Sequence, residues 1–183
     1  MNGAAPPRPW PGSPPGPPAP GPDVAVADEQ SAVRLDVPRL AELARAALAD
    51  QGVIRGELSL SFVDEATMAE LNGRYLAGEG PTDVLAFPLD AEPGGAAFSP
   101  AGAGGAPVLV GDVVVCPAVA ERNAAARSAP TGDELALLVV HGVLHVLGMD
   151  HAEPAEGAAM QEAERRLLAR HYHRSPIPED RGG

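Results

Sequence analysis

Residues 141–151 read His-Gly-Val-Leu-His-Val-Leu-Gly-Met-Asp-His and hold three of the chain's five histidines. His141 and His145 are four residues apart, so on a helix they share one face, one turn from each other. Gly148 would end this helix, because glycine adopts the left-handed conformation without a Cβ clash. The chain can then fold back and bring His151 towards the other two. Three neutral imidazoles with room for a fourth ligand are the pattern of a catalytic zinc site.

The alternative interpretation of this stretch is a helix end that is rich in histidine by chance. The spacing combined with the stopping glycine makes that alternative the weaker one. Apolar residues separate the histidines, which indicates that the segment is partly buried. Buried imidazoles need hydrogen-bond or metal partners.

Composition divides the 183 residues into three parts. Residues 1–22 carry ten of the 21 prolines, so we expect a disordered or polyproline II tail with no secretory signal. A ligand for an SH3-type domain is a less favoured interpretation of its Pro-x-x-Pro spacings. Residues 23–174 are long enough for one domain with a real core, and residues 175–183 form a loose C-terminal tail.

Charge and cysteine content narrow the classes of function. The net charge of −12 argues against indiscriminate nucleic-acid binding, although a local basic groove is compatible with it. No uninterrupted apolar run approaches 18 residues, so we expect no membrane span. The single cysteine, Cys116, excludes an intramolecular disulfide and fits a reducing compartment.

Hydrophobic periodicity and turn signals predict an alternation of strands and helices. The predicted strands cover residues 24–27, 57–63, 82–88 and 108–116, the last of them central. The predicted helices cover 36–52, a short segment after Asp64, 117–128, 131–145 and 155–172, and the predicted loops cover 73–81 and 89–107. This order suggests an α+β fold, with a small mixed β-sheet covered by helices.

The helix that leads into the histidines is apolar almost all round, so it should be the central buried helix, with the metal site at its C-terminal end. Its start has the form of a capping box, with Thr131 as the cap and Glu134 reaching back. A rigid helix gives metal ligands a fixed base, which a catalytic geometry requires.

The histidine spacing matches that of the metzincin peptidases except at one residue. Those enzymes have glutamate directly after the first histidine as the general base, whereas this chain has Gly142. The departure argues against a peptidase. A zinc-bound water with a pKa near 7 still supplies hydroxide for another hydrolysis.

Two further segments carry a resemblance to a known family. They read Thr-Asp-Val-Leu-Ala-Phe-Pro at 82–88 and Gly-Asp-Val-Val-Val-Cys at 111–116, with Leu71-Asn72 before them. Together with the histidine box, they make the chain resemble the bacterial YbeY family of metal-dependent endoribonucleases, from about residue 24 to 171.

The resemblance implies one Zn²⁺ ion held by His141, His145 and His151. It implies a cytoplasmic endonuclease specific for single-stranded RNA, acting in maturation of the 3′ end of 16S rRNA and in ribosome quality control. The implied partners are rRNA and the small ribosomal subunit, a ribosomal protein and an Era-type GTPase, with no membrane partner.

Two positions depart from the family pattern. Many members have arginine after the tyrosine of the Leu-Asn-x-x-Tyr segment, where this chain has Leu76, and the strand's serine is Ala86. Arg74, two residues before Leu76, is a candidate substitute for the missing phosphate-binding cation.

The remaining site candidates each have a plainer alternative. Asp150 could orient a ligand histidine or simply form a turn, and Asp112 and Asp83 could be acid–base groups or hydrogen-bond at strand ends. A buried Asp112 would need a partner or an edge position. Arg122 and Arg127 could contact phosphate, although a solvated helix face is favoured.

The last candidates are a histidine pair and the cysteine. His171 and His173 are expected at the surface, and Cys116 in the core.

The leading hypothesis for the function is a zinc-dependent endoribonuclease. A non-catalytic ribosome-assembly factor with structural zinc is the second hypothesis, and a metzincin-like metallopeptidase is the third.

Overall fold

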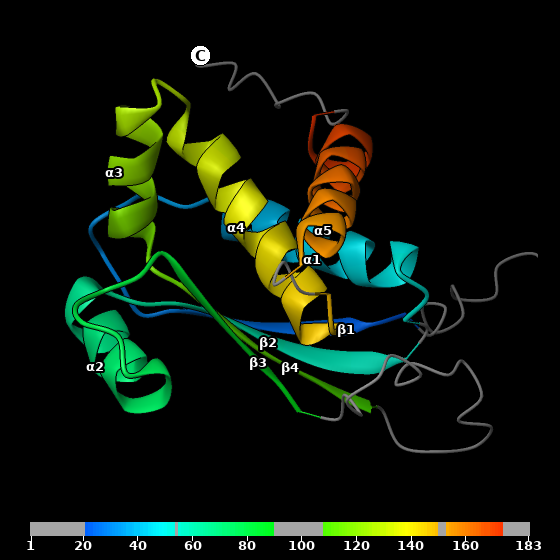
Figure 1. Ribbon diagram of the computed structural model, residues 1–183, viewed down its shortest axis with the longest axis horizontal. Coiled ribbons are helices and arrows are strands. Elements are labelled where there is room, and N and C mark those ends of the chain that lie inside the picture. Colours follow the sequence, from blue (N-terminus) through cyan, green and yellow to red (C-terminus); the bar gives the residue numbers. More distant parts are fainter. Residues whose placement is uncertain (1–20, 54, 90–107, 150–152, 174–183) are drawn as a thin grey trace, which may run out of the picture.

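The computed structural model describes residues 21–53, 55–89, 108–149 and 153–173 (Figure 1). The predicted tail at 175–183, nearly all of the tail at 1–22 and all but Leu89 of the predicted loop at 89–107 lie outside these ranges. Within the described part, helices cover a four-stranded sheet, which confirms the predicted α+β class.

The sheet consists of β1 (Asp23–Asp28), β2 (Gly56–Phe62), β3 (Val84–Pro88) and β4 (Val108–Val115), in the spatial order β1-β2-β4-β3. β1, β2 and β4 pair in parallel, while β3 runs antiparallel to β4 along the edge. The sheet is therefore mixed, as predicted, and β4 is an inner strand. Pro88 ends β3, consistent with a residue that cannot donate to a ladder.

Helix α1 (Val37–Asp50) provides the crossover that parallel β1 and β2 require. Its start agrees with the sequence prediction, since the Asp36 side chain accepts a hydrogen bond from Arg39 N and a proline occupies the first turn. Gly52 follows the helix at φ +87°, a conformation that favours glycine. The remaining helices are α2 (Glu65–Leu76), α3 (Pro117–Ala126), α4 (Thr131–Val146), α5 (Pro154–Leu167) and the π-helix η1 (Leu168–Tyr172).

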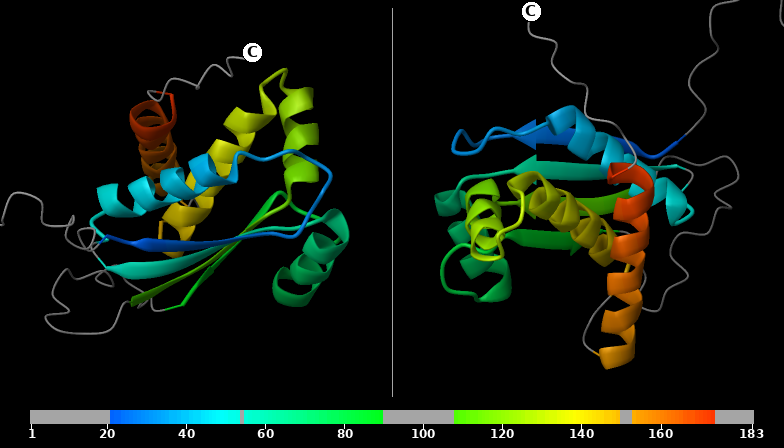
Figure 2. Two further views of the ribbon diagram at one scale, coloured as in Figure 1. Left: turned by 180° about the vertical axis from the view of Figure 1, so that it is seen from behind. Right: turned by 90° about the horizontal axis from the view of Figure 1, so that it is seen from above.

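The helices lie on both sides of the sheet but unequally (Figures 1 and 2). α1, α4 and α5 lie together over one face, and α4 contacts β3, β4, α1, α3 and α5. α2 covers one end of the opposite face, where it encloses a smaller apolar cluster that includes Met68, Leu85 and Cys116. Because ten of the sixteen residues of α4 are buried, this helix is the central buried helix that its composition predicts.

Two local predictions were wrong. Residues 73–76 are the last turn of α2 and not part of a loop, because Gly73 is accommodated within the helix. The helix ends at Leu76, and the N–H of its cap residue, Ala77, bonds to Asn72 O. The capping box at the start of α4 does not form, since the cap residue is Pro130 with no side-chain cap bond. The Glu134 carboxylate is instead paired with Arg127.

The contact between α4 and β4 depends on Gly142. A Cβ on this residue would lie only 2.5 Å from Val113 Cγ1, closer than two carbon atoms can approach. Val113 is fully buried and β-branched, so its side chain has little freedom to move aside. Gly142 therefore allows the helix to approach the strand closely, and it also explains why no carboxylate can occupy the position that a metzincin uses.

No helix in the described ranges has the length and apolar character needed to cross a membrane.

The Gly142 contact predicts opposite effects of alanine at two helical glycines. Gly142→Ala should lower the free energy of unfolding by about 1–3 kcal/mol, the usual cost of overpacking a core. Gly73→Ala should raise it by about 0.5–1 kcal/mol, since alanine favours helices and its Cβ would meet only Gly78 O at 3.7 Å. Urea denaturation measures both, and equal stability of the two variants would contradict the packing argument.

Candidate metal centre

The C-terminal end of α4 places the first two candidate ligands. Leu147 is the cap residue, and Gly148 follows at φ +86°. Gly148 N donates to His145 O at 2.9 Å and Met149 N donates to Leu144 O at 3.0 Å, the two bonds of a Schellman motif. The predicted role of Gly148 as the helix stop is confirmed, and the last turn, which carries His145, is fixed by hydrogen bonds.

His141 and His145 lie side by side on this last part of α4, as the four-residue spacing predicts. Their ring centroids are 4.5 Å apart and the rings are inclined by 76°. Both residues are partly buried, and the His141 side chain is 27% exposed. Two imidazoles are thus held next to each other at the border between the core and solvent.

Helix α5 adds a residue that the sequence analysis missed. Glu164 Oε1 lies 2.8 Å from His141 Nδ1, and the glutamate side chain is only 12% exposed. A carboxylate can only accept this bond, so Nδ1 is the donor, and in the neutral ring a metal would bind through Nε2. A signal was present, because Glu164 lies four residues after Met160 and three before Leu167, both predicted to face inward.

The third predicted ligand, His151, and its neighbour Asp150 lie outside the described residues. Within the described ranges, no three histidine, cysteine or acidic side chains come together as a metal site. The set of His141, His145 and His151 therefore stays a prediction. The residues that are described fit a metal, because a carboxylate behind a histidine is the usual support of a metal-binding imidazole.

A cavity of about 310 Å³ opens beside His141. Its wall combines apolar side chains, such as Leu137 and Met160, with polar groups that come from four segments of the chain. The polar groups include Asp83, Arg127, Glu134, Gln161 and Glu164. The cavity therefore joins the candidate ligands to a set of charged groups on neighbouring elements.

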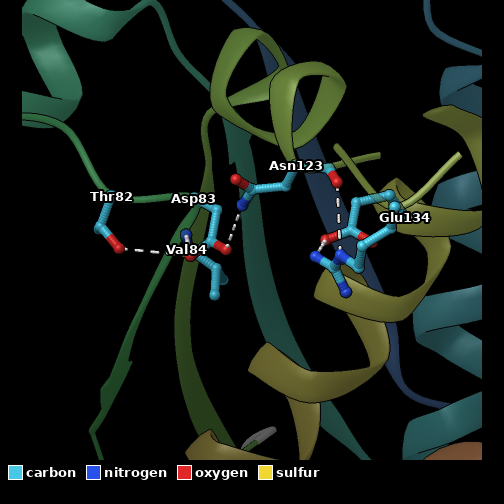
Figure 3. Close-up of polar contacts among 6 residues, drawn as sticks. Thr82, Asp83, Val84, Asn123 and Glu134 are labelled. Atoms are coloured by element: carbon cyan, nitrogen blue, oxygen red, sulfur yellow. Dashed lines mark hydrogen bonds and ion pairs between the residues drawn. The ribbon is translucent and has the colours of Figure 1, made fainter. Parts of the chain in front are cut away.

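Asp83, just before β3, lines one side of this cavity, and Figure 3 shows its hydrogen bonds. Its carboxylate accepts bonds from Val84 N at 2.9 Å, Asn123 Nδ2 at 3.0 Å and Thr82 Oγ1 at 3.3 Å. Its carbonyl oxygen accepts a bond from Cys116 N at 2.8 Å. These bonds favour the strand-end role that the sequence analysis set beside an acid–base role.

Arg127 and Glu134 form the other polar pair of the cavity. Arg127 Nη2 donates to Glu134 Oε1 at 2.5 Å, and Arg127 Nε donates to Asn123 O at 3.3 Å. The arginine side chain is 55% exposed, whereas the glutamate side chain is 5% exposed. Asn123 thus connects this pair to Asp83, as Figure 3 shows.

Comparison with known proteins identifies the family. The family model described as Endoribonuclease YbeY matches residues 25–172. The chain belongs to the YbeY family. It is 48% identical over 150 residues to the endoribonuclease YbeY of Salinispora tropica, covering 80% of this chain and 94% of the relative. It is 44% identical over 147 residues to that of Mycobacterium tuberculosis, covering 79% and 81%.

A solved structure supports the fold. The solution structure of a protein from Thermotoga maritima superposes with a TM-score of 0.53 at 21% identity, covering 86% of this chain and 99% of that one. This structure confirms the α+β fold, while the family model and the relatives confirm the resemblance to the YbeY family that the sequence motifs indicate.

Other predicted site residues lie away from the cavity. Asp112 is on inner strand β4, in register with Ser59 and Phe87, and alternation places its side chain on the face opposite to that of Val113 and α4. It therefore does not join His141. Asp112 was expected at an edge of the sheet or, if buried, beside a partner. It lies on an inner strand, and its side chain is only partly buried.

The α2 candidates are also separate from His141. Arg74 Cζ lies 5.7 Å from the centre of the Tyr75 ring, which in turn contacts Phe87 edge-on at 5.2 Å. Leu76, at the position of the family arginine, is 64% exposed. Among the described residues that line the cavity, neither Arg74 nor Leu76 occurs.

The remaining candidates have ordinary surroundings. Arg122 Nη2 pairs with Glu65 Oε1 of α2 at 2.6 Å on the surface. Cys116 is fully buried, as predicted, and burial raises the pKa of its thiol, which keeps it protonated and unreactive. His173 is exposed, whereas His171 is only partly so and its Nε2 lies 3.6 Å from Asp50 Oδ1.

The Schellman motif predicts a graded response at Gly148. Gly148→Ala should lower the free energy of unfolding by roughly 1–2 kcal/mol, because a Cβ is strained at positive φ. Gly148→Asn should cost less, since asparagine tolerates the left-handed conformation. Thermal or urea denaturation tests the order, and alanine as well tolerated as asparagine would contradict the assigned helix end.

Proposed function

We propose that the protein is a zinc-dependent endoribonuclease that cuts single-stranded RNA. Its membership of a family of endoribonucleases supports the reaction class. The observation that carries the metal dependence is the Glu164–His141 contact of 2.8 Å beside His145, because a carboxylate behind a histidine is the usual support of a metal-binding imidazole.

His141, His145 and His151 would hold the ion. Bound zinc supplies a water whose pKa is lowered to about 7 and neutralises charge on a phosphoryl oxygen. Three protein ligands would leave one position for water or substrate, as in catalytic and not structural zinc sites. This expectation separates the proposal from a non-catalytic assembly factor with structural zinc.

The protein's own residues supply orientation. Glu164 fixes the ring of His141, and the bonded last turn of α4 fixes His145. Gly142 contributes no carboxylate, and the contact with Val113 leaves no space for one. The general base of a metzincin peptidase is therefore missing at that position, so the proposed reaction is phosphodiester and not peptide hydrolysis.

The biological substrate is proposed from the family resemblance. We place the activity in the cytoplasm, in maturation of the 3′ end of 16S rRNA and in ribosome quality control. The partners would be rRNA and the small ribosomal subunit, with a ribosomal protein and an Era-type GTPase. Since the chain has a net charge of −12, RNA binding would rely on local contacts and not on a broad basic surface.

Loss of the two described ligands should abolish both metal binding and cleavage. The double variant His141→Ala, His145→Ala should retain no stoichiometric zinc and show no cleavage of single-stranded rRNA above background. His173→Ala, which removes an exposed imidazole at the far end of η1, is the matched control and should behave as wild type. Metal analysis and gel-based RNA cleavage measure the two properties on the same preparations.

Equal cleavage by the double variant and the wild type would show that the activity is a contaminant and would overturn the proposal. One zinc per chain in a wild-type protein that cleaves no RNA would favour the assembly factor instead.

Glu164 provides an independent test through metal affinity. Glu164→Ala should weaken zinc binding by about 10–100-fold, the usual effect of removing the partner of a ligand histidine. Glu162→Ala on the same helix, which removes a surface carboxylate paired with Arg165, is the control and should leave affinity unchanged. Competition with a chelating dye measures the affinities. Indistinguishable affinities of the two variants would contradict the assigned role of Glu164.

A further inference from the structure

We propose that Arg127 binds a phosphate of the RNA next to the one that is cut. This inference rests on the proposed endoribonuclease function and adds a positioning residue for its substrate. Arg127 is the one arginine among the described residues that line the cavity beside His141. More than half of its side chain is exposed, so a ligand in the cavity can reach it.

Two bonds from different helices fix the guanidinium. Glu134 of α4 accepts from Nη2 at 2.5 Å, and the carbonyl of Asn123 in α3 accepts from Nε at 3.3 Å. Asn123 is itself held through its side chain by Asp83 at 3.0 Å (Figure 3). An exposed arginine normally samples many rotamers, so this network places a cation in one orientation before any ligand arrives.

The burial of Glu134 indicates that its ion pair with Arg127 does more than stabilise the fold. Glu134 and Asn72 are the two buried polar residues of the described chain, and Glu134 is the charged one. Burying a carboxylate costs desolvation that a single ion pair often fails to recover, and replacing buried ion pairs with apolar residues is often neutral or stabilising. Glu134 is buried and pairs with a half-exposed arginine. We therefore explain its burial by the fixed orientation that it gives to Arg127.

The guanidinium keeps donors for a ligand. Arginine has five N–H groups in a planar fork, and Glu134 and Asn123 account for one on Nη2 and the one on Nε. Both N–H groups of Nη1 and one of Nη2 remain. A planar pair of such donors matches the geometry of phosphate oxygens.

The spacing along α4 identifies which phosphate is bound. Glu134 precedes His141 by seven residues, which is two helical turns or about 10 Å along the same face. This separation favours different phosphates for His141 with its partners and for a guanidinium tied to Glu134. Arg127 would thus hold a flanking phosphate and set the position of the strand relative to the metal centre.

Arg122 provides a matched control within the same region. It lies five residues earlier, its side chain is 56% exposed, and it pairs with a carboxylate at 2.6 Å, so exposure and pairing are nearly those of Arg127. Its partner is Glu65 of α2, itself 45% exposed, and Arg122 does not line the cavity beside His141. The two arginines therefore differ mainly in the surface that they face.

The experiment measures binding of a short single-stranded oligoribonucleotide by fluorescence anisotropy across a series of salt concentrations. Arg127→Gln, the double variant Arg127→Gln, Glu134→Gln and the control Arg122→Gln are prepared both in the active protein and in the His141→Ala, His145→Ala background. The double variant removes both charges of the pair, so it avoids an unpaired buried carboxylate. Thermal denaturation verifies that each variant is folded.

We expect Arg127→Gln and the double variant to weaken RNA binding about 5–10-fold and to reduce the slope of log affinity against log salt by about 0.7, the effect of one lost phosphate contact on a single strand. In the active protein, KM should rise by a similar factor while kcat changes little. Arg122→Gln should match wild type. A merely structural role of Arg127 would leave the salt slope unchanged.

An unchanged Kd and salt slope in the folded double variant, or an equal loss in Arg122→Gln, would overturn the inference. The experiment can contradict this inference without contradicting the proposed function, and the reverse. RNA binding that depends on Arg127 without cleavage by the wild type would contradict the endoribonuclease proposal alone. Cleavage that is indifferent to Arg127 would contradict this inference alone.

Discussion

The close contact between Gly142 of α4 and Val113 of β4 is the constraint on which the site depends. A side chain at 142 would collide with a β-branched residue in the fully buried core, so only glycine lets the helix lie this close to the inner strand without strain. Once α4 is fixed on β4, His141 and His145 are carried by a helix that the core holds on several sides. The same contact excludes the carboxylate that a zinc peptidase would need at this position.

The polar groups around the end of α4 then act in two ways. Glu164 from α5 contacts the Nδ1 of a histidine and so orients its ring. Glu134, two turns earlier on α4, supports an arginine at the cavity rim, and Asp83 and Asn123 connect that arginine to β3 and α3. In both cases a largely buried carboxylate orients a more exposed functional group, which is how a site is preorganised on rigid elements.

The sequence predicted most of the fold because its signals were local. Asp36 and Pro38 define the start of α1, Gly148 the end of α4, and the β-branched run of β4 an inner strand, and each depends on neighbours in the chain. The failures were where tertiary contacts decide. Glu134 has the spacing of a capping box, but its carboxylate pairs with Arg127 instead. Gly73 favours a loop, but it lies within helix α2.

The sequence also predicted the part of the candidate site that depends on neighbours in the chain. The helical pair His141 and His145 follows from spacing alone, and its placement is as expected. Glu164 is 23 residues from His141, so only the packing of α5 against α4 brings it near, although its inward helical position was visible in the sequence. Asp112 was a candidate acid–base group, but strand alternation directs its side chain to the other face.

The central claim is that the end of α4 holds a catalytic zinc ion with an open coordination position. X-ray absorption spectroscopy at the zinc edge of the purified, metal-loaded protein tests it most directly. We predict three imidazole nitrogens and one light oxygen ligand at about 2.0–2.1 Å, with no sulfur. A fourth protein ligand closing the site, or a zinc–sulfur distance from Cys116, would contradict it.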